Sequence, residues 1–169
     1  MIQLYSLIFI LNIIPRFLFI YLFPETGGDY EIYTTVAKNI VNGCGVSLSE
    51  PGSGDCVPHF GGNHGPGYPL FISLIWSIFN FSDFMVRYIQ AIIYGFSCVW
   101  LSYSLFKYSG EKKSILIIGI ITALSPLLLA WPRYVQTETL ALASSIWVLA
   151  EIFLSLSKNK IRIFTTALA

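Results

Sequence analysis

The clearest shortage in this 169-residue chain is charge. Ten Lys and Arg and nine Asp and Glu amount to 11% of the residues, whereas 55% are hydrophobic and the mean hydropathy is +0.69. Soluble domains carry about 25% charged residues, so the chain lacks the polar surface that a soluble globule needs. This excludes an ordinary cytosolic domain and a disordered chain. The net charge of +1 leaves no electrostatic case for a nucleic-acid partner. The class of protein that is left is an all-α integral membrane protein.

Cysteine is scarce as well. The three cysteines form no CxxC pair and no Cys/His zinc pattern. Cys44 and Cys56 flank a stretch rich in Gly, Ser and Pro. They can form a disulfide if this stretch faces an oxidising compartment, and two reduced thiols are the open alternative. Cys98 lies in an apolar run, which predicts a small buried residue.

Long apolar runs predict about four transmembrane helices, at residues 1–23, 84–106, 114–131 and 139–156. The first run is too long for a signal-peptide core and has neither a basic start nor an A-x-A cleavage pattern. The apolar run 69–81 is short for a span and fits an interfacial or re-entrant helix. Residues 24–83 are therefore expected to form one loop carrying short amphipathic helices. In the first of these, residues 29–41, Ile32, Val36 and Ile40 share one face.

Charged residues are sorted along the chain. Five acids and only Lys38 lie in residues 25–66. Six of the ten basic residues lie in two short turns: Lys107, Lys112, Lys113, Lys158, Lys160 and Arg162. The positive-inside rule places both turns in the cytoplasm. The loop 25–66, the turn 132–137 and the active site are then expected on the outer face, with the N-terminus inside, provided that residues 69–81 do not cross.

Two carboxylates stand out by position. Asp29 follows the first span and Glu138 begins the fourth, so the expected topology places both at the outer membrane face. An ionisable group at that depth costs free energy and is a functional candidate. The alternative is structural, because both residues can stabilise a helix N-terminus.

Three arginines and two histidines form a second group of candidates. Arg16, Arg87 and Arg133 can all reach the outer side, where they predict either ion pairs or a bound anion such as phosphate. His59 and His64 lie in a Gly-rich loop and predict contacts to a polar substrate. Two histidines without a third ligand leave a divalent metal unsupported, and the loop glycines do not follow nucleotide-binding spacings.

Four segments in order resemble the membrane glycosyltransferases that use polyprenyl-phosphate sugars, of the protein O-mannosyltransferase and aminoarabinose transferase type. They are GGDYEIYTTVAKNIVNGCGVS, HGPGYPLFISLIW, SDFMVRYIQAIIYG and SPLLLAWPRYVQTETLALA. The resemblance implies the C-type glycosyltransferase fold, of which this chain is expected to be the N-terminal part. It also implies that residues 66–74 form a horizontal helix on the outer membrane face.

The resemblance further implies roles for single residues. Asp29 matches the acid that the family uses as catalytic base or acceptor-binding group, and Glu138 matches its second acid. Arg87 and Arg133 match arginines near these places, close to the donor phosphate. The aromatic side chains of Tyr30 and Tyr33 join the substrate-binding candidates, although an aromatic belt at the membrane interface explains them equally well.

The function expected from the resemblance is inverting transfer of a sugar from a polyprenyl-phosphate donor. The acceptor is a hydroxyl or amine of a protein, lipid or glycan, and no cofactor beyond the lipid-linked donor is certain. The expected location is the cell membrane of a bacterium or archaeon, with membrane lipid as a further partner. The alternative is a small non-enzymatic four-span membrane protein that acts as an assembly partner or lipid carrier.

Overall fold

The computed structural model describes residues 1–50, 54, 56–58 and 65–157. These residues are helical apart from connections and one isolated β-bridge between Ser47 and Pro58. The helices are α1 (Ile2–Leu22), α2 (Tyr30–Val41), α3 (Gly67–Phe79), α4 (Asp83–Ser109), α5 (Lys112–Leu124), α6 (Pro126–Ala130), the 3-10 helix η1 (Trp131–Arg133) and α7 (Glu138–Ser157). Among them α1, α4 and α7 are long and apolar enough to cross a membrane. The predicted all-α integral membrane class is confirmed.

The chain forms two compact units. Of the described residues, the helical unit contains Met1–Pro24, Tyr88–Arg133 and those from Glu138 to Ser157. The loop unit contains the described residues within Glu25–Arg87, together with Tyr134–Thr137. Helix α4 therefore begins in the loop unit and continues through the helical unit.

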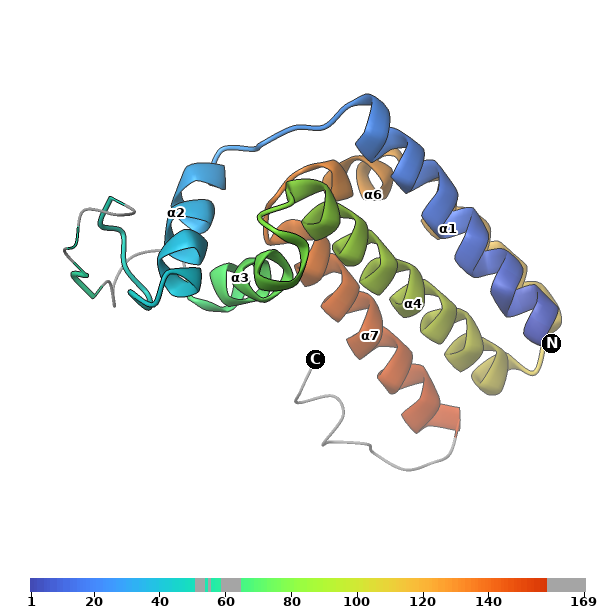
Figure 1. Cartoon of the computed structure of the whole chain (residues 1–169). Helices are drawn as coiled ribbons and strands as arrows, with labels where there is room; N and C mark the ends of the chain where they lie inside the picture. Colours follow the sequence, from blue (N-terminus) through green and yellow to red (C-terminus); the bar gives the residue numbers. More distant parts are fainter. Residues whose placement is uncertain (51–53, 55, 59–64, 158–169) are drawn as a thin grey trace. The chain divides into compact units, whose positions relative to one another are not determined.

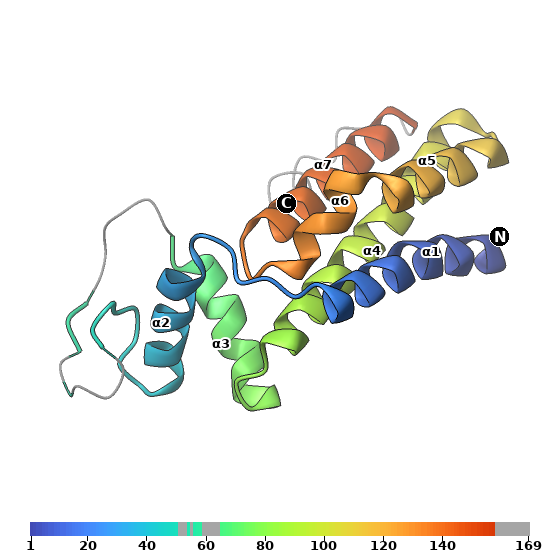
Figure 2. The same cartoon turned by 90° about the horizontal axis from the view of Figure 1, so that it is seen from above.

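In the helical unit, α4 contacts both other candidate spans (Figures 1 and 2). The rings of Phe9 in α1 and Phe96 in α4 lie 4.7 Å apart, and those of Trp100 in α4 and Trp147 in α7 lie 5.6 Å apart. Cys98, which is reduced and buried as expected, belongs to the hydrophobic core beneath these contacts. Aromatic side chains of this size supply much of the contact area between helices.

The segment 114–131, expected to be a single span, is divided into α5, α6 and η1. The break lies at Ser125, whose backbone is extended with ψ 117°, directly before Pro126. Proline disfavours the helical conformation in the preceding residue and has no N–H to donate to the carbonyl four residues earlier. That carbonyl belongs to Thr122.

Arg16 of α1 compensates for this break. Its Nη2 donates to the Thr122 carbonyl oxygen at 2.8 Å, in place of the proton that Pro126 lacks. Its Nη1 donates to the Asn12 carbonyl oxygen at 2.6 Å, and its guanidinium carbon lies 4.2 Å from the ring centre of Tyr94. Helix breaks are tolerated at membrane depth when a neighbouring group satisfies the freed backbone. Arg16, fully buried, fills that structural role.

A small residue brings α1 and α5 together around this network. A Cβ at Gly119 in α5 would collide with the side chain of Ile8 in α1. The Asn12 amide extends the contact, with its Nδ2 donating to the Gly119 carbonyl oxygen at 3.5 Å. Close backbone approach at small residues is a common way for helices to pack in membranes.

In the loop unit, α2 packs against α3. The amphipathic helix expected at 29–41 is present as α2, with Val36 buried and Ile32 and Ile40 partly buried. The short helix expected at 69–81 is present as α3, with 13 residues. At 1.5 Å per residue it is about 20 Å long, too short to span a bilayer core of about 30 Å.

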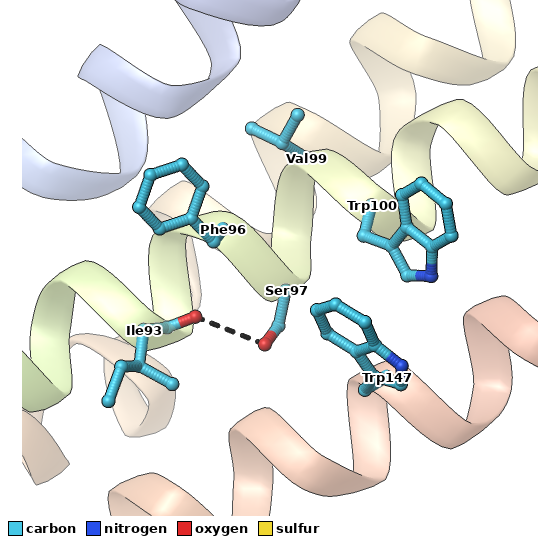
Figure 3. A pocket seen from close by; sticks show the side chains of 6 residues that line it. All are labelled: Ile93, Phe96, Ser97, Val99, Trp100 and Trp147. Carbon is cyan, nitrogen blue, oxygen red and sulfur yellow. Dashed lines mark hydrogen bonds between the residues drawn. The ribbon is translucent and has the colours of Figure 1, made fainter. Parts of the chain in front are cut away.

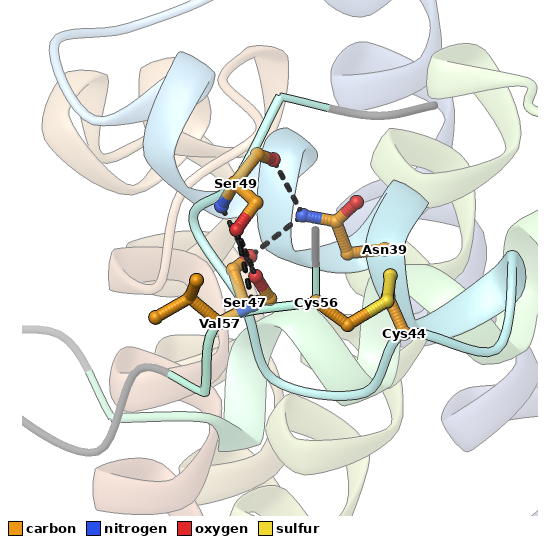
Figure 4. The surroundings of a disulfide bond; sticks show 6 residues. All are labelled: Asn39, Cys44, Ser47, Ser49, Cys56 and Val57. Carbon is orange, nitrogen blue, oxygen red and sulfur yellow. Dashed lines mark hydrogen bonds between the residues drawn. A yellow bond between two sulfur atoms is a disulfide. The ribbon is translucent and has the colours of Figure 1, made fainter. Parts of the chain in front are cut away.

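The connection after α2 is closed by a disulfide between Cys44 and Cys56, so the disulfide alternative is the observed one (Figure 4). The buried Asn39 amide of α2 holds the same connection, donating to the carbonyl oxygens of Ser47 and Ser49 at 2.8 and 2.9 Å. The disulfide therefore closes the connection on itself, and the Asn39 amide holds it against α2.

Candidate functional site

The segment between α1 and α2, residues 25–29, is held by the loop unit. Arg87, 5% exposed at the start of α4, donates from Nη2 to the Glu25 carbonyl oxygen at 2.9 Å. Gly27 adopts φ +83°, and the side chain of Gln136 packs against it. Asp29 ends the segment at the N-cap position of α2, and its side chain makes no capping hydrogen bond. A capping hydrogen bond therefore does not explain why an acid stands at the start of α2.

Tyr30 follows Asp29 and is hydrogen-bonded to the first residue of α4. Its hydroxyl donates to Asp83 Oδ2 at 2.6 Å. Burial, this hydrogen bond and the charge of Asp83 raise the pKa of Tyr30 to about 12, against an opposing effect of Arg87. The phenol therefore stays protonated at neutral pH and acts as a hydrogen-bond donor.

Asp83 is a site residue that the sequence did not single out. Its other oxygen, Oδ1, is buried without a hydrogen-bond partner among the described residues. Its position directly before a long apolar run suggested only an interruption between helices. The one available signal was an acidic residue one helical turn before Arg87, a spacing that places both on one face of α4.

The two remaining candidates in the loop unit, Arg87 and Tyr33, are both buried. The Arg87 guanidinium lies 5.5 Å from the ring centre of Phe84, and its Nε is buried without a hydrogen-bond partner in the described part of the chain. The ring of Tyr33 is buried and meets Tyr68 of α3 edge-on, with centroids 5.0 Å apart. Tyr33 thus contributes to the packing of α2 on α3, and its substrate role stays a prediction.

Arg133 and Glu138 belong to the helical unit. The Arg133 guanidinium in η1 lies 5.6 Å from the ring centre of Phe19 in α1. Glu138 is the first residue of α7, where the helix dipole favours an anion. Its Oε2 is buried and has no hydrogen-bond partner within the described ranges. One oxygen of the second acid is therefore left without a partner by the described residues.

His59 and His64 lie outside the described residues, so their substrate role also stays a prediction. Among the residues that the structure does describe, no three His, Cys, Asp or Glu side chains are grouped to hold a metal ion.

An apolar hollow of about 490 Å³ lies between α4 and α7 (Figure 3). It is lined by Ile93, Phe96, Ser97, Val99, Trp100 and Trp147. The Ser97 hydroxyl donates to the Ile93 carbonyl oxygen at 3.1 Å, which leaves an apolar lining. Beside it, Trp100 Nε1 donates to Oε1 of the buried Glu151 at 3.0 Å. None of the predicted site residues lines this hollow.

Comparison with known proteins yields one family. The family model described as dolichyl-phosphate-mannose-protein mannosyltransferase matches residues 63–169, which include Arg87, Arg133 and Glu138 but not Asp29. No curated protein and no solved structure matches the chain.

Proposed function

This chain belongs to the dolichyl-phosphate-mannose-protein mannosyltransferase family. We propose that it contains the residues that activate the acceptor in a sugar-transfer reaction. The family indicates a glycosyltransferase that uses lipid-phosphate sugars, and the three apolar helices fit its membrane location. The proposed reaction moves a sugar, with mannose as the first choice, from a polyprenyl phosphate to an acceptor hydroxyl or amine. The family description makes a protein hydroxyl the first acceptor to test.

The observation that carries this proposal is the Asp29 carboxylate. It stands at the start of α2 without capping the helix, on a segment that Arg87 and Gln136 hold in place. A carboxylate can take the proton of an acceptor hydroxyl as the oxygen attacks the anomeric carbon. The bond from that carbon to the phosphate oxygen then breaks, and the electron pair leaves with the phosphate. One direct displacement inverts the anomeric configuration.

Roles are also proposed for two cations and for the second acid. Arg87 and Arg133 are assigned to the phosphate, where a guanidinium stabilises the negative charge that develops on the leaving group. Glu138 is assigned to the substrate because one of its oxygens is buried and has no partner in the described part of the chain. Tyr30, whose hydroxyl donates a hydrogen bond to Asp83, is available as a neutral neighbour of the base.

The disulfide supports the proposed outer-face location. Cys44 and Cys56 join in the connection that follows α2, and disulfides persist in oxidising compartments such as the periplasm, the cell exterior or the lumen of the secretory pathway. This agrees with the placement of the basic turns in the cytoplasm. We assign the site to the outer face of a bacterial or archaeal cell membrane.

The test compares Asp29→Asn with Glu31→Gln. Glu31 is an exposed acid in the first turn of α2, so its replacement removes the same charge two residues away. Membranes containing the full-length protein are given radiolabelled polyprenyl-phosphate mannose and a Ser/Thr-rich acceptor peptide. General-base catalysis contributes roughly 10²–10⁴-fold, so Asp29→Asn is expected to reduce transfer at least 100-fold while Glu31→Gln retains it.

Two results would count against the proposal. Transfer by Asp29→Asn within twofold of the wild type would remove Asp29 from the role of base. Absence of transfer by the wild-type protein with any lipid-phosphate sugar would favour the non-enzymatic alternative, a four-span assembly partner or lipid carrier.

A further inference from the structure

Asp83, the first residue of α4, is bonded to a part of the loop unit that is distant in sequence. Its Oδ2 accepts a hydrogen bond of 2.6 Å from the hydroxyl of Tyr30, which lies 53 residues earlier. Tyr30 is the first residue of α2 and directly follows the proposed base, Asp29. The Asp83 carboxylate therefore joins the start of α4 to the residue beside Asp29.

The start of α4 does not require this hydrogen bond. Ser82, the residue before the helix, already accepts a hydrogen bond at Oγ from the backbone N–H of Met85 at 3.4 Å. A side-chain oxygen bonded to an N–H of the first turn is what an N-cap residue supplies. The helix dipole also favours an acid in the first turn, but that effect involves no partner in α2. Helix formation therefore leaves the contact between Asp83 and Tyr30 unexplained.

One turn of α4 holds both ends of the segment that contains Asp29. Arg87 donates to the Glu25 carbonyl oxygen at 2.9 Å, where the segment begins. Asp83 accepts from Tyr30, where the segment ends. Asp83 and Arg87 are four residues apart, which is about 6 Å along the helix axis and places them on one face. Residues 25–30 are therefore attached at both ends to the same short stretch of α4.

The backbone between these attachments is not stiff by itself. It contains Gly27, with φ +83°, and Gly28. Glycine has a wider choice of backbone conformations than any other residue. Two glycines directly before Asp29 therefore leave its position poorly defined by the segment alone. The hydrogen bonds to α4, together with the packing of α2 on α3, supply this definition.

We propose that Asp83 is a positioning residue for the proposed base. The inference rests on the proposed function, because it concerns how Asp29 is placed for that same reaction. By accepting from Tyr30, Asp83 holds the neighbour of the base to the helix that carries Arg87, the cation assigned to the leaving phosphate. A displacement of about 1 Å in a reacting group can cost about 100-fold in rate. Loss of this hydrogen bond is therefore expected to slow the transfer step.

The test removes the hydrogen bond from each side in turn. Asp83→Leu removes the acceptor, Tyr30→Phe removes the donor and keeps the ring, and Asp83→Asn keeps a neutral acceptor oxygen. The matched controls are Glu111→Leu, an exposed acid directly before α5, and Tyr21→Phe, an exposed tyrosine near the end of α1. Full-length protein in membranes is assayed with polyprenyl-phosphate mannose and the acceptor peptide. Rates are expressed per folded molecule, measured as the monodisperse fraction after detergent extraction.

Asp83→Leu and Tyr30→Phe are each expected to lower kcat about tenfold and to leave KM for donor and peptide unchanged, because both substrates still bind while the base is displaced. Both controls are expected to match the wild type. Asp83→Asn is expected to lose less, since its amide oxygen can still accept from Tyr30. In an Asp29→Asn background the same changes are expected to leave the residual transfer unaltered, because no base remains to be positioned.

A merely structural role predicts a different pattern. Asp83→Leu and Tyr30→Phe would then lower transfer by the same factor with and without the Asp29 carboxylate, and this result would overturn the inference. Wild-type kcat in Tyr30→Phe would overturn it as well, and this variant decides the outcome alone if Asp83→Leu does not accumulate. Loss of transfer in Asp29→Asn beside either result leaves the proposed function intact. Retained transfer in Asp29→Asn marks a failure of the function itself.

Discussion

Two buried arginines, one in each unit, differ in what surrounds them. Arg16 in the helical unit and Arg87 in the loop unit both donate to a backbone carbonyl oxygen and both lie over an aromatic ring. The Arg16 partners are backbone oxygens of α1 and α5, and one of them is left free by Pro126. Arg87 instead anchors an irregular segment that leads to Asp29.

The difference shows that burial alone does not define what an arginine does. What separates the two is the backbone that each guanidinium holds. Around Arg16 the protein's own backbone uses the charge, which is what a helix break inside a membrane requires. Around Arg87, the guanidinium instead holds the Glu25 carbonyl oxygen in an irregular connection. Buried atoms without a hydrogen-bond partner among the described residues occur beside both arginines, at Asp83 Oδ1 and at the Tyr94 hydroxyl.

The largest expected effect tests the structural side of this comparison. Replacing Arg16 by Met leaves the Thr122 carbonyl oxygen without a donor, and an orphaned buried acceptor costs about 1–3 kcal/mol. Thermal unfolding in detergent micelles measures this loss. In a Pro126→Ala background the alanine N–H can satisfy the same carbonyl, so the cost of Arg16→Met is expected to fall by about 1 kcal/mol in a double-mutant cycle.

The same double-mutant cycle can also contradict the structural role given to Arg16. Equal costs of Arg16→Met in both backgrounds would mean that Pro126 and Arg16 are not coupled. Arg16→Met protein with normal stability but no transfer activity would place Arg16 beside Arg87 as a functional residue.

The next effect concerns activity in the loop unit. Arg87→Met removes the donor that holds the Glu25 carbonyl oxygen, together with a cation assigned to the leaving phosphate. Transfer per folded molecule is expected to fall at least tenfold, since removal of one stabilising donor commonly costs about 10²–10³ in rate. Lys38→Met, which removes an exposed cation from α2, is the control and is expected to be neutral. Transfer by Arg87→Met within twofold of the control would mean that Arg87, like Arg16, has only a structural role.

A smaller effect is expected at Gly27. Alanine there must adopt φ +83° and place its Cβ 2.5 Å from Gln136 Cδ. Such strain costs about 1–3 kcal/mol, and it is expected to lower both the melting temperature and transfer. Gly28→Ala is the matched control, because nothing lies within 4 Å of a Cβ at that position. If both variants behave alike, the contact between Gly27 and Gln136 does not shape the site.

Local features of the fold were predictable from the sequence. The apolar lengths of α1, α4 and α7 and the amphipathic pattern of α2 depend only on neighbours along the chain, so their spacing carried the information. Pro126 lies within the segment 114–131, which the sequence predicts as a single span and the structure divides. Whether a proline interrupts a span depends on a neighbouring helix supplying the missing donor, and Arg16 lies 106 residues away from Thr122 in sequence.

The candidate site was predictable by residue type but not by grouping. Asp29 and Arg87 could be singled out because charge is scarce and each lies beside an apolar run. Gln136 and Asp83 could not, because an amide and an acid near helix ends are common in any protein. The surroundings of Gln136 depend on packing between distant segments, where it meets Gly27. Asp83 is marked only by a buried oxygen that has no partner among the described residues.

The smallest expected effect concerns Tyr30 and the pH dependence of the loop unit. Because its pKa rises from 10.0 to about 12 in the folded chain, the folded state holds the phenol proton more tightly than the unfolded chain does. The stability that this contributes is complete below pH 10 and is lost as the pH rises through about 12. Tyr30→Phe lacks the titrating group. It is therefore expected to be slightly less stable at pH 8 and to lose less stability than the wild type between pH 10 and pH 12.

Tyr21→Phe, at an exposed residue near the end of α1, is the control for the general effect of alkali. A wild type and Tyr30→Phe that lose stability in parallel would mean that the hydrogen bond to Asp83 does not hold Tyr30, and the loop unit would lose one of the contacts that distinguish it from the Arg16 network.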